Sequence, residues 1–153
     1  MQFLLIKKLY FYGGFRWGEG FAPNQLFYLD VSKSFTTFDI SLMPWTDLSS
    51  ISDVTCKNAA AACADGSTIY YIGGHHSGGL VSKFDTIFLQ WSEPITSGSI
   101  PTSPYEKPGE EIKFVQCVNL GHKIHIYGGF SSHKMNILDT SVILVYIYIV
   151  TNV

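Results

Sequence analysis

Three segments of this chain place four mostly apolar residues directly before a pair of glycines. They are LYFYGG at 9–14, IYYIGG at 69–74 and IHIYGG at 124–129. Aromatic and β-branched residues favour strands, and glycine lets the backbone turn sharply or adopt a positive φ. A strand motif that recurs at intervals of 60 and 55 residues predicts a repeat architecture. Function in such a chain is expected on a surface that equivalent units build together.

A second marker makes the spacing regular. Each glycine pair is followed by an apolar stretch that closes on Asp30, Asp85 or Asp139. Asp30 and Gly73 are 43 residues apart, as are Asp85 and Gly128, whereas the glycine pair and the next Asp are separated by 16, 11 or 10. This pattern predicts a constant frame with one variable surface loop. We expect the three Asp residues to accept hydrogen bonds from turn amides and not to act as a catalytic pair.

The second copy gives the clearest strand pattern. Residues 69–72, 81–85 and 87–91 are rich in aromatic and β-branched side chains and predict three consecutive strands. Residues 58–63 are small and apolar, which suits a strand in the crowded inner position of a radial sheet. Asp65-Gly66 then predicts the turn into the next strand. One unit is therefore expected to contain four short antiparallel strands.

This unit resembles a kelch repeat, which is one four-stranded blade of a β-propeller and spans about 50 residues. The kelch pattern places a Trp about six residues after the acidic end of its strand. The second copy has Trp91 there, whereas Thr36 and Val145 stand at that position in the first and third copies. The segment 26–35 is also similar to propellers of the galactose oxidase/kelch type from filamentous fungi. The residues assigned to the repeat frame are Gly13, Gly14, Gly73, Gly74, Gly128, Gly129, Asp30, Asp85, Asp139 and Trp91.

The resemblance implies an all-β chain. We expect a kelch-type β-propeller fragment with about three four-stranded antiparallel blades, at approximately 1–44, 55–95 and 111–150, and a loop at 96–110. Propellers close with about 4–8 blades, so three units are not expected to close a ring without another chain or further blades. The apolar run 142–150 is expected to be the outer strand of the third blade, where an open edge would favour aggregation.

Charge and hydropathy exclude several classes of protein. The formal net charge is −2, so no basic surface is expected for a nucleic acid. The apolar run 142–150 is far shorter than the ~20 residues of a transmembrane helix. Residues 3–6 are too short for the core of a signal peptide and precede Lys7-Lys8, which predicts a cytoplasmic location.

The chain has three cysteines, an odd number that argues against a complete disulfide framework. Cys63 and Cys117 occupy similar places in consecutive units. We favour small hydrophobic residues on inner strands as their role, with a disulfide bridge or redox pair as the alternative.

The loops after the glycine pairs are the predicted binding surface, because they are expected to leave the blades on one face. Aromatic and Arg side chains are enriched at protein interfaces, and a protein partner is therefore expected. For Phe15 and Phe130 we favour packing beneath the loops, and for Arg16 and Trp17 binding and simple exposure weigh equally. The candidate binding residues are Phe15, Arg16, Trp17, His75, His76, Phe130 and His133.

No catalytic constellation is found in the sequence. His75 and His76 are adjacent, and His122 and His125 are three apart, so within a strand the members of each pair would point to opposite faces and could not share a metal. We expect a non-catalytic protein-interaction module without metal or cofactor. The alternatives are a fragment of a copper carbohydrate oxidase similar to galactose oxidase, and a truncated, non-functional paralogue.

Overall fold

The computed structural model describes residues 7–13, 15–16, 18, 20–21, 25–36, 38–52, 60–74, 81–93, 96–97, 115–128, 135–141 and 145–150, with only the backbone at 15–16, 21, 96–97 and 145–150. Within these ranges the elements are β-strands and two short 3-10 helices, η1 (Ile40–Leu42) and η2 (Ser49–Ile51). The predicted all-β class is therefore confirmed. The chain divides into two compact units, Met1–Cys56 and Lys57–Val153.

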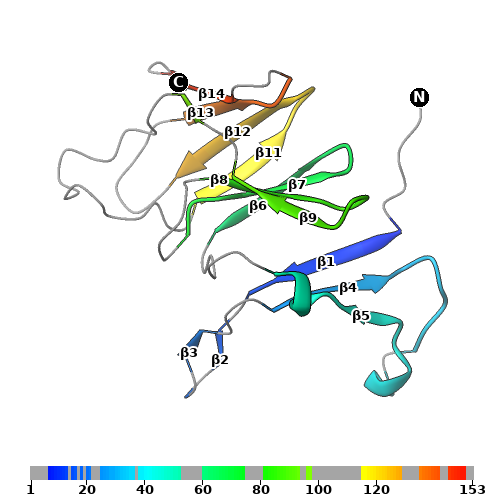
Figure 1. Ribbon diagram of the computed structural model, residues 1–153. Helices are drawn as coiled ribbons and strands as arrows, with labels where there is room; N and C mark the ends of the chain where they lie inside the picture. The colour runs from blue at the N-terminus through cyan, green and yellow to red at the C-terminus, as the bar shows by residue number, and fades with distance from the viewer. Residues whose placement is uncertain are drawn as a thin grey trace. The chain divides into compact units, whose positions relative to one another are not determined.

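The first unit contains a three-stranded antiparallel sheet (Figure 1). Its order is β1-β4-β5, so the middle strand pairs with both neighbours. A two-stranded hairpin lies between β1 and β4 in the sequence. The strands are β1 (Lys8–Tyr12), β2 (Phe15–Arg16), β3 (Gly20–Phe21), β4 (Leu26–Asp30) and β5 (Trp45–Asp47).

The second unit contains two sheets. The sheet that we call sheet I is an antiparallel meander with the order β6-β7-β8-β9. Sheet II has the order β10-β14-β13-β12-β11, in which only β10 runs parallel to its neighbour. The strands are β6 (Ala61–Asp65), β7 (Thr68–Ile72), β8 (Val81–Asp85), β9 (Gln90–Ser92), β10 (Thr96–Ser97), β11 (Val115–Asn119), β12 (Lys123–Gly128), β13 (Met135–Asp139) and β14 (Val145–Val150).

One hydrogen bond recurs in the three sheets. The amide after the frame Asp donates to the carbonyl before the glycine strand, and the three pairs are Val31 to Lys7 at 2.7 Å, Thr86 to Ser67 at 2.9 Å and Thr140 to His122 at 2.8 Å. The hairpins that follow have the same register, since Lys8 pairs with Asp30, Thr68 with Asp85 and Lys123 with Asp139. The three sequence copies are thus structurally equivalent at the level of strand pairing.

The first glycine of each pair has a left-handed backbone. The φ angles of Gly13, Gly73 and Gly128 are 66°, 70° and 90°. An L-residue with a Cβ is strained in this region. This requirement explains why a glycine ends the strand in each copy.

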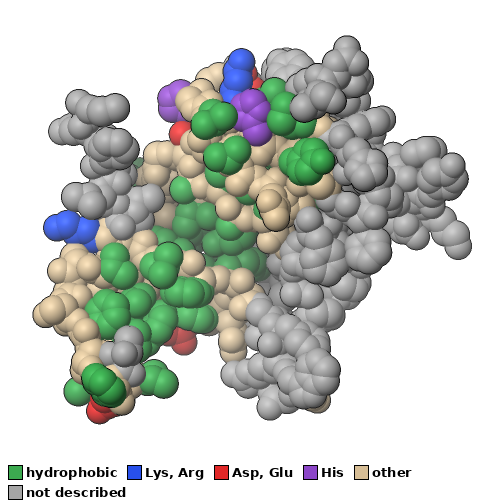
Figure 2. Space-filling model, turned by 180° about the vertical axis from the view of Figure 1, so that it is seen from behind, with side chains coloured by type: hydrophobic (Ala, Val, Ile, Leu, Met, Phe, Trp, Pro, Cys, Tyr) green, Lys and Arg blue, Asp and Glu red, His purple; other side chains and the backbone are tan. Residues whose placement is uncertain are grey.

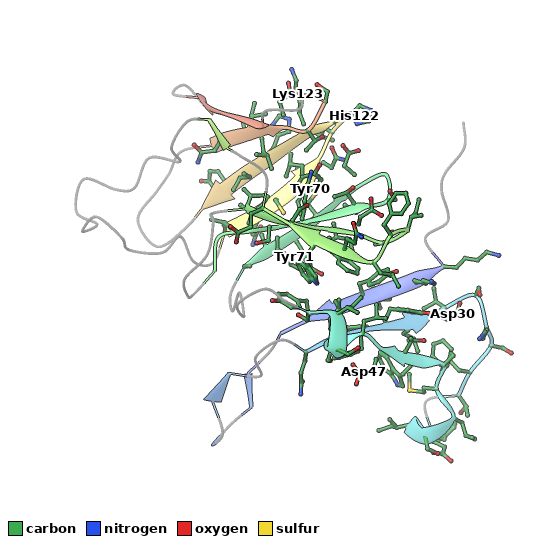
Figure 3. The ribbon with its side chains drawn as sticks, viewed as in Figure 1. Asp30, Asp47, Tyr70, Tyr71, His122 and Lys123 are labelled. Carbon is green, nitrogen blue, oxygen red and sulfur yellow. The ribbon has the colours of Figure 1, made fainter. Side chains whose placement is uncertain are left out.

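The core of the second unit lies between its two sheets. Tyr70, Ile72 and Val81 of sheet I pack in one cluster with side chains of sheet II. Alternation along a strand sends neighbours to opposite faces, so Tyr71 points away from this core and its ring lies 5.4 Å from that of Trp91 (Figure 3). The sheet II members of the cluster are Val115, Ile124, Ile126 and Leu138.

The predicted strand 87–91 is wrong at its start. Residues 86–89 form a turn and β9 begins at Gln90. The amides of Ile87 and Phe88 donate to Asp85 Oδ1 at 2.8 and 2.9 Å, and Leu89 has a φ of 54°. These hydrogen bonds favour a tight turn over the β-propensity of the apolar side chains.

The residues assigned to the Trp position in the first and third copies are also wrong. In the third copy Leu138, the residue before Asp139, pairs with Ile147 and not with Val145. Trp91 pairs with Phe84, the residue before Asp85, and Trp45 pairs with Leu29, the residue before Asp30. Trp45 is therefore the structural equivalent of Trp91. Thr36 lies in the longer connection between β4 and β5, which a fixed residue count does not reveal.

The apolar run at the C-terminal end is not an edge strand. β14 pairs with β13 on one side and with β10 on the other, so the expected outer strand lies inside sheet II. Thr96–Ser97, which begins the segment expected to be a loop, provides the covering strand. The pairs with β10 cover the outer edge of β14 at Val145 and Tyr146.

Candidate functional site

The two sheets of the second unit place their glycine ends together. Asp65 is the last residue of β6, and its Oδ2 lies 3.0 Å from Nδ1 of His122 in the turn between β11 and β12. Asn119 Nδ2 donates to the Ala64 carbonyl at 3.0 Å, which joins the same turns. Since β7 and β12 both leave these adjoining turns, their far ends, with Gly73 and Gly128, lie at the common opposite end of the sheets. The connections that follow therefore start from one end of this unit.

The predicted binding residues lie mostly outside the described residues. Phe15 and Arg16 have their backbones in β2, opposite β3, and the structure describes no side chain for either. Five of the predicted binding residues and two of the frame glycines lie outside the described residues. They are Trp17, His75, His76, Phe130 and His133, and Gly14 and Gly129. The structure thus shows where the loops after Gly73 and Gly128 begin. The role of their side chains in binding remains a prediction.

Asp65 is the centre of a polar cluster that joins the two sheets. Thr140 Oγ1 donates to Asp65 Oδ2 at 2.5 Å, on the oxygen that also faces His122 Nδ1. Partial burial opposes ionisation of Asp65, but the hydrogen bonds from Thr140, His122 and Asn119 together hold its pKa below the ordinary value. The hydrogen bond with Asp65, and then its charge, raises the pKa of His122. Both groups are therefore favoured in their charged forms.

This cluster does not have the arrangement of a nucleophilic triad. A triad needs a hydroxyl that donates to the imidazole while the carboxylate holds the other ring nitrogen. Here the Thr140 hydroxyl and the His122 ring face the same carboxylate oxygen, and Thr140 Oγ1 also lies 2.8 Å from the His122 carbonyl. The arrangement can tie two sheets together, but it does not place the His122 imidazole to accept the proton of the hydroxyl. Sequence analysis missed this cluster because its members lie far apart along the chain.

The frame Asp residues have the turn role that the sequence predicts. Asp30 and Asp139 each accept from the amide of the Ser two residues later at 3.0 Å, while Asp85 accepts from two turn amides. The side-chain hydrogen bonds from Ser32 and Ser141 hold the pKa values of Asp30 and Asp139 below the ordinary range. Asp39 and Asp47 repeat the same Asp-x-Ser turn. These carboxylates are occupied by local hydrogen bonds.

The first unit presents an aromatic surface on one face of its sheet. Phe11 stacks on Phe27 with ring centroids 5.2 Å apart, and Trp45 meets both rings edge-on at 5.5 and 5.4 Å. Leu9, Phe11 and Trp45 are 52%, 37% and 38% exposed. Figure 2 shows hydrophobic side chains gathered on the surface of this unit. An exposed apolar surface of this kind is a feature of interaction sites.

Two thiols meet where β6 and β11 are in contact. Cys63 and Cys117 are half-buried free thiols that pack against the core cluster and share a side-chain hydrogen bond. Burial raises the pKa of Cys117 to about 12, and the neighbouring Cys63 adds to the shift. Burial also raises the pKa of Cys63. Thiols with raised pKa values are poor nucleophiles at neutral pH.

Among the described residues, no group of three or more His, Cys, Asp or Glu side chains is arranged to hold a metal ion. The part of the chain that the structure describes also contains no helix with the length and apolar character needed to cross a bilayer. Comparison with protein-family models and with curated proteins finds no match. Any assignment of function therefore rests on the repeat frame and the surfaces described above.

Proposed function

We propose that this chain forms blades of a kelch-type β-propeller and acts as a non-catalytic protein-interaction module. The observation that carries the proposal is the shared geometry of the three copies. Each has the same hydrogen bond into its hairpin, the same register and a left-handed glycine at the strand end. Repeats of this kind commonly place variable loops on a constant frame and use the resulting surface for binding.

The proposed binding surface consists of the loops that follow the glycine pairs. In the second unit these loops start from one end of two packed sheets, as the Asp65 to His122 contact at the opposite end requires. The longest separation between a glycine pair and its Asp follows Gly14, and this loop contains Arg16 and Trp17. Arg and Trp are residue types that often dominate binding energy at protein interfaces.

The proposal is tested with proximity crosslinking from the loops. A photoreactive residue at His76 or His133 should capture a defined partner, identified by mass spectrometry, more strongly than the same residue at Phe88. Phe88 is a suitable comparison because it is 72% exposed in a turn at the other end of β8.

The double substitution Arg16→Ala and Trp17→Ala should then reduce capture of that partner by at least about tenfold, as expected for loss of two interface anchors. The matched control is Ile87→Ala with Phe88→Ala, which should leave capture unchanged. Equal capture by the Arg16/Trp17 variant and the parent chain would refute binding through these loops.

A further inference from the structure

The contact between sheets I and II uses two different faces. We call the face that sheet I contributes the covering face and the face that sheet II contributes the covered face. The covering face includes Ala61, Cys63, Tyr70, Ile72 and Val81, and the covered face includes Val115, Cys117, Ile124, Ile126 and Leu138. Because the two faces come from opposite sides of equivalent sheets, every sheet of this repeat has one face of each type.

The repeat frame identifies the covered face of the first unit. Counted from the shared hydrogen bond at Lys7 and His122, Leu9 and Phe11 of β1 correspond to Ile124 and Ile126 of β12. The same face of the first unit also includes Phe27, Leu29, Trp45 and, paired with Phe27, the exposed Asp47. Ile124 and Ile126 are 0% and 1% exposed beneath sheet I, whereas Leu9 and Phe11 are 52% and 37% exposed.

The same frame identifies the covering face of sheet II. Tyr70 and Ile72 correspond to His125 and Tyr127, and Cys63, which pairs with Tyr70, corresponds to Val118, which pairs with His125. Tyr70 and Ile72 are 7% and 0% exposed, but Tyr127 and Val118 are 55% and 51% exposed.

The next position continues the contrast. Asp65, which forms the polar contacts between sheets I and II, corresponds to Leu120. Leu120 is apolar and 61% exposed. The covering face of sheet II thus exposes Val118, Leu120 and Tyr127 at positions where sheet I packs against sheet II. The polar Gln116 and His125 lie on the same face.

From these equivalences we infer that the chain associates head to tail with a second copy of itself, with the covering face of sheet II in one copy on the covered face of the first unit in the other. The inference rests on the repeat frame that also supports the proposed function. The two faces are complementary in kind, because the contact between sheets I and II already joins a covering face to a covered face.

A head-to-tail contact is heterologous, so it joins two different surfaces. A substitution on either surface should therefore prevent self-association, and two differently substituted copies should still form one intact contact. Phe11→Asp changes the covered face of the first unit, and Tyr127→Asp changes the covering face of sheet II. The inference predicts that each variant alone is monomeric and that their mixture forms a one-to-one complex that cannot grow further.

The experiment is sedimentation velocity on the full chain from low to high micromolar concentration. The parent chain should self-associate, and each variant should weaken association by at least about tenfold, as expected at an interface anchor. The controls are Phe38→Asp and Ile87→Asp, at positions that are 100% and 70% exposed outside both faces. Both controls should associate like the parent chain.

Three results would overturn the inference. The parent chain could stay monomeric throughout, or only one of the two variants could lose association, which would indicate a contact between identical faces. The mixture could also fail to form the complex. Circular dichroism checks that each variant is folded. If Phe11→Asp is not folded, Leu9→Lys replaces it, and if Tyr127→Asp is not folded, Val118→Lys replaces it.

A loop variant separates this inference from the proposed function. Arg16 and Trp17 are not among the residues that define either face, so Arg16→Ala with Trp17→Ala should self-associate like the parent chain. Unchanged partner capture by this variant would refute the proposed function alone, whereas a parent chain that stays monomeric while the variant loses capture would refute the self-association alone.

Discussion

Asp65 and His122 connect two sheets through a contact of 3.0 Å between Oδ2 and Nδ1. The two residues lie 57 positions apart in the sequence. Asp65 is the last residue of β6, and His122 is in the turn between β11 and β12. Asp65 is largely shielded while His122 is largely exposed, so the carboxylate holds an imidazole that remains in contact with solvent. The pH dependence of folding should report on this contact.

The stability that the contact provides should be greatest at mildly acidic pH. The pKa of His122 is raised in the folded chain, so its contribution is complete below the unfolded value of about 6.5 and is lost as pH rises through the raised folded value. The pKa of Asp65 is lowered, so its contribution is complete above the unfolded value of about 3.9 and is lost as pH falls through the folded value. Thermal unfolding of the parent chain and of His122→Gln should therefore differ most between about pH 4 and 6.5.

The partner residue provides the control for this pH profile. In an Asp65→Asn background, His122→Gln should have little further pH-dependent effect, because the carboxylate that favours the charged imidazole is absent. Asp139 also contributes to the raised pKa of His122, so a small residual dependence is expected. An undiminished difference in the Asp65→Asn background would contradict the assignment.

Gly66 should tolerate asparagine better than alanine. Its φ is 58° and a Cβ placed there would meet no atom within 4 Å, so the cost of substitution comes from the backbone alone. Gly66→Ala should lower the free energy of unfolding by about 1–2 kcal/mol, and Gly66→Asn should lower it less, because Asn enters the left-handed region more readily. Denaturant titration measures both, and equal losses would refute a purely conformational cost.

The long connection in the first unit should be replaceable by the short one in the second. Trp45 and Trp91 hold equivalent positions after connections of different length, so 31–43 can be exchanged for residues 86–89 without a change of register. The exchange shortens the loop, which favours folding by up to about 1 kcal/mol of closure entropy. Trp45 fluorescence and near-ultraviolet circular dichroism should keep the parent signature of packed rings. A shift of Trp45 emission to that of a solvated indole would show that the connection itself sets the register.

Cys117 should react slowly with thiol reagents in the folded chain. Burial raises its pKa to about 12, and only the thiolate reacts, so its rate near pH 8 should be roughly a thousandfold below that of a thiol with the ordinary pKa of about 8.5. The rate should rise with pH as the thiolate fraction grows. Mass spectrometry after timed labelling separates Cys117 from the other cysteines, and labelling as fast as in the denatured chain would contradict this prediction.

The sequence predicts strands best where apolar periodicity and turn residues agree. The bounds of β4 and β8 follow from their aromatic and β-branched residues and the terminal Asp. Trp45 was misassigned because residue counting assumes a constant connection, whereas pairing depends on register alone. Ile87 and Phe88 have strand propensity, but their amides bond to Asp85, and local hydrogen bonds decided their conformation.

Contacts between sheets were beyond sequence reasoning. Cys63 and Cys117 were recognised as equivalent in position, but their mutual hydrogen bond depends on how β6 faces β11. The cluster of Asp65, His122 and Thr140 joins residues up to 75 positions apart. The available signals were the Asp-Gly turn and a His at φ 64°, and only the first is visible in the sequence.

The short strand β10 has a mechanical consequence for the second unit. It begins four positions after Ser92, a span of at most about 14 Å, and it pairs with the edge of sheet II that lies furthest from β11. Sheets I and II are therefore connected in two places. β6 contacts β11, and the chain runs directly from β9 of sheet I to β10 of sheet II. When the unit is pulled from its two ends, the force reaches β10 from its N-terminal side and β14 from its C-terminal side, and it therefore acts along this parallel pair. The two sheets should then unfold together and should not separate one after the other.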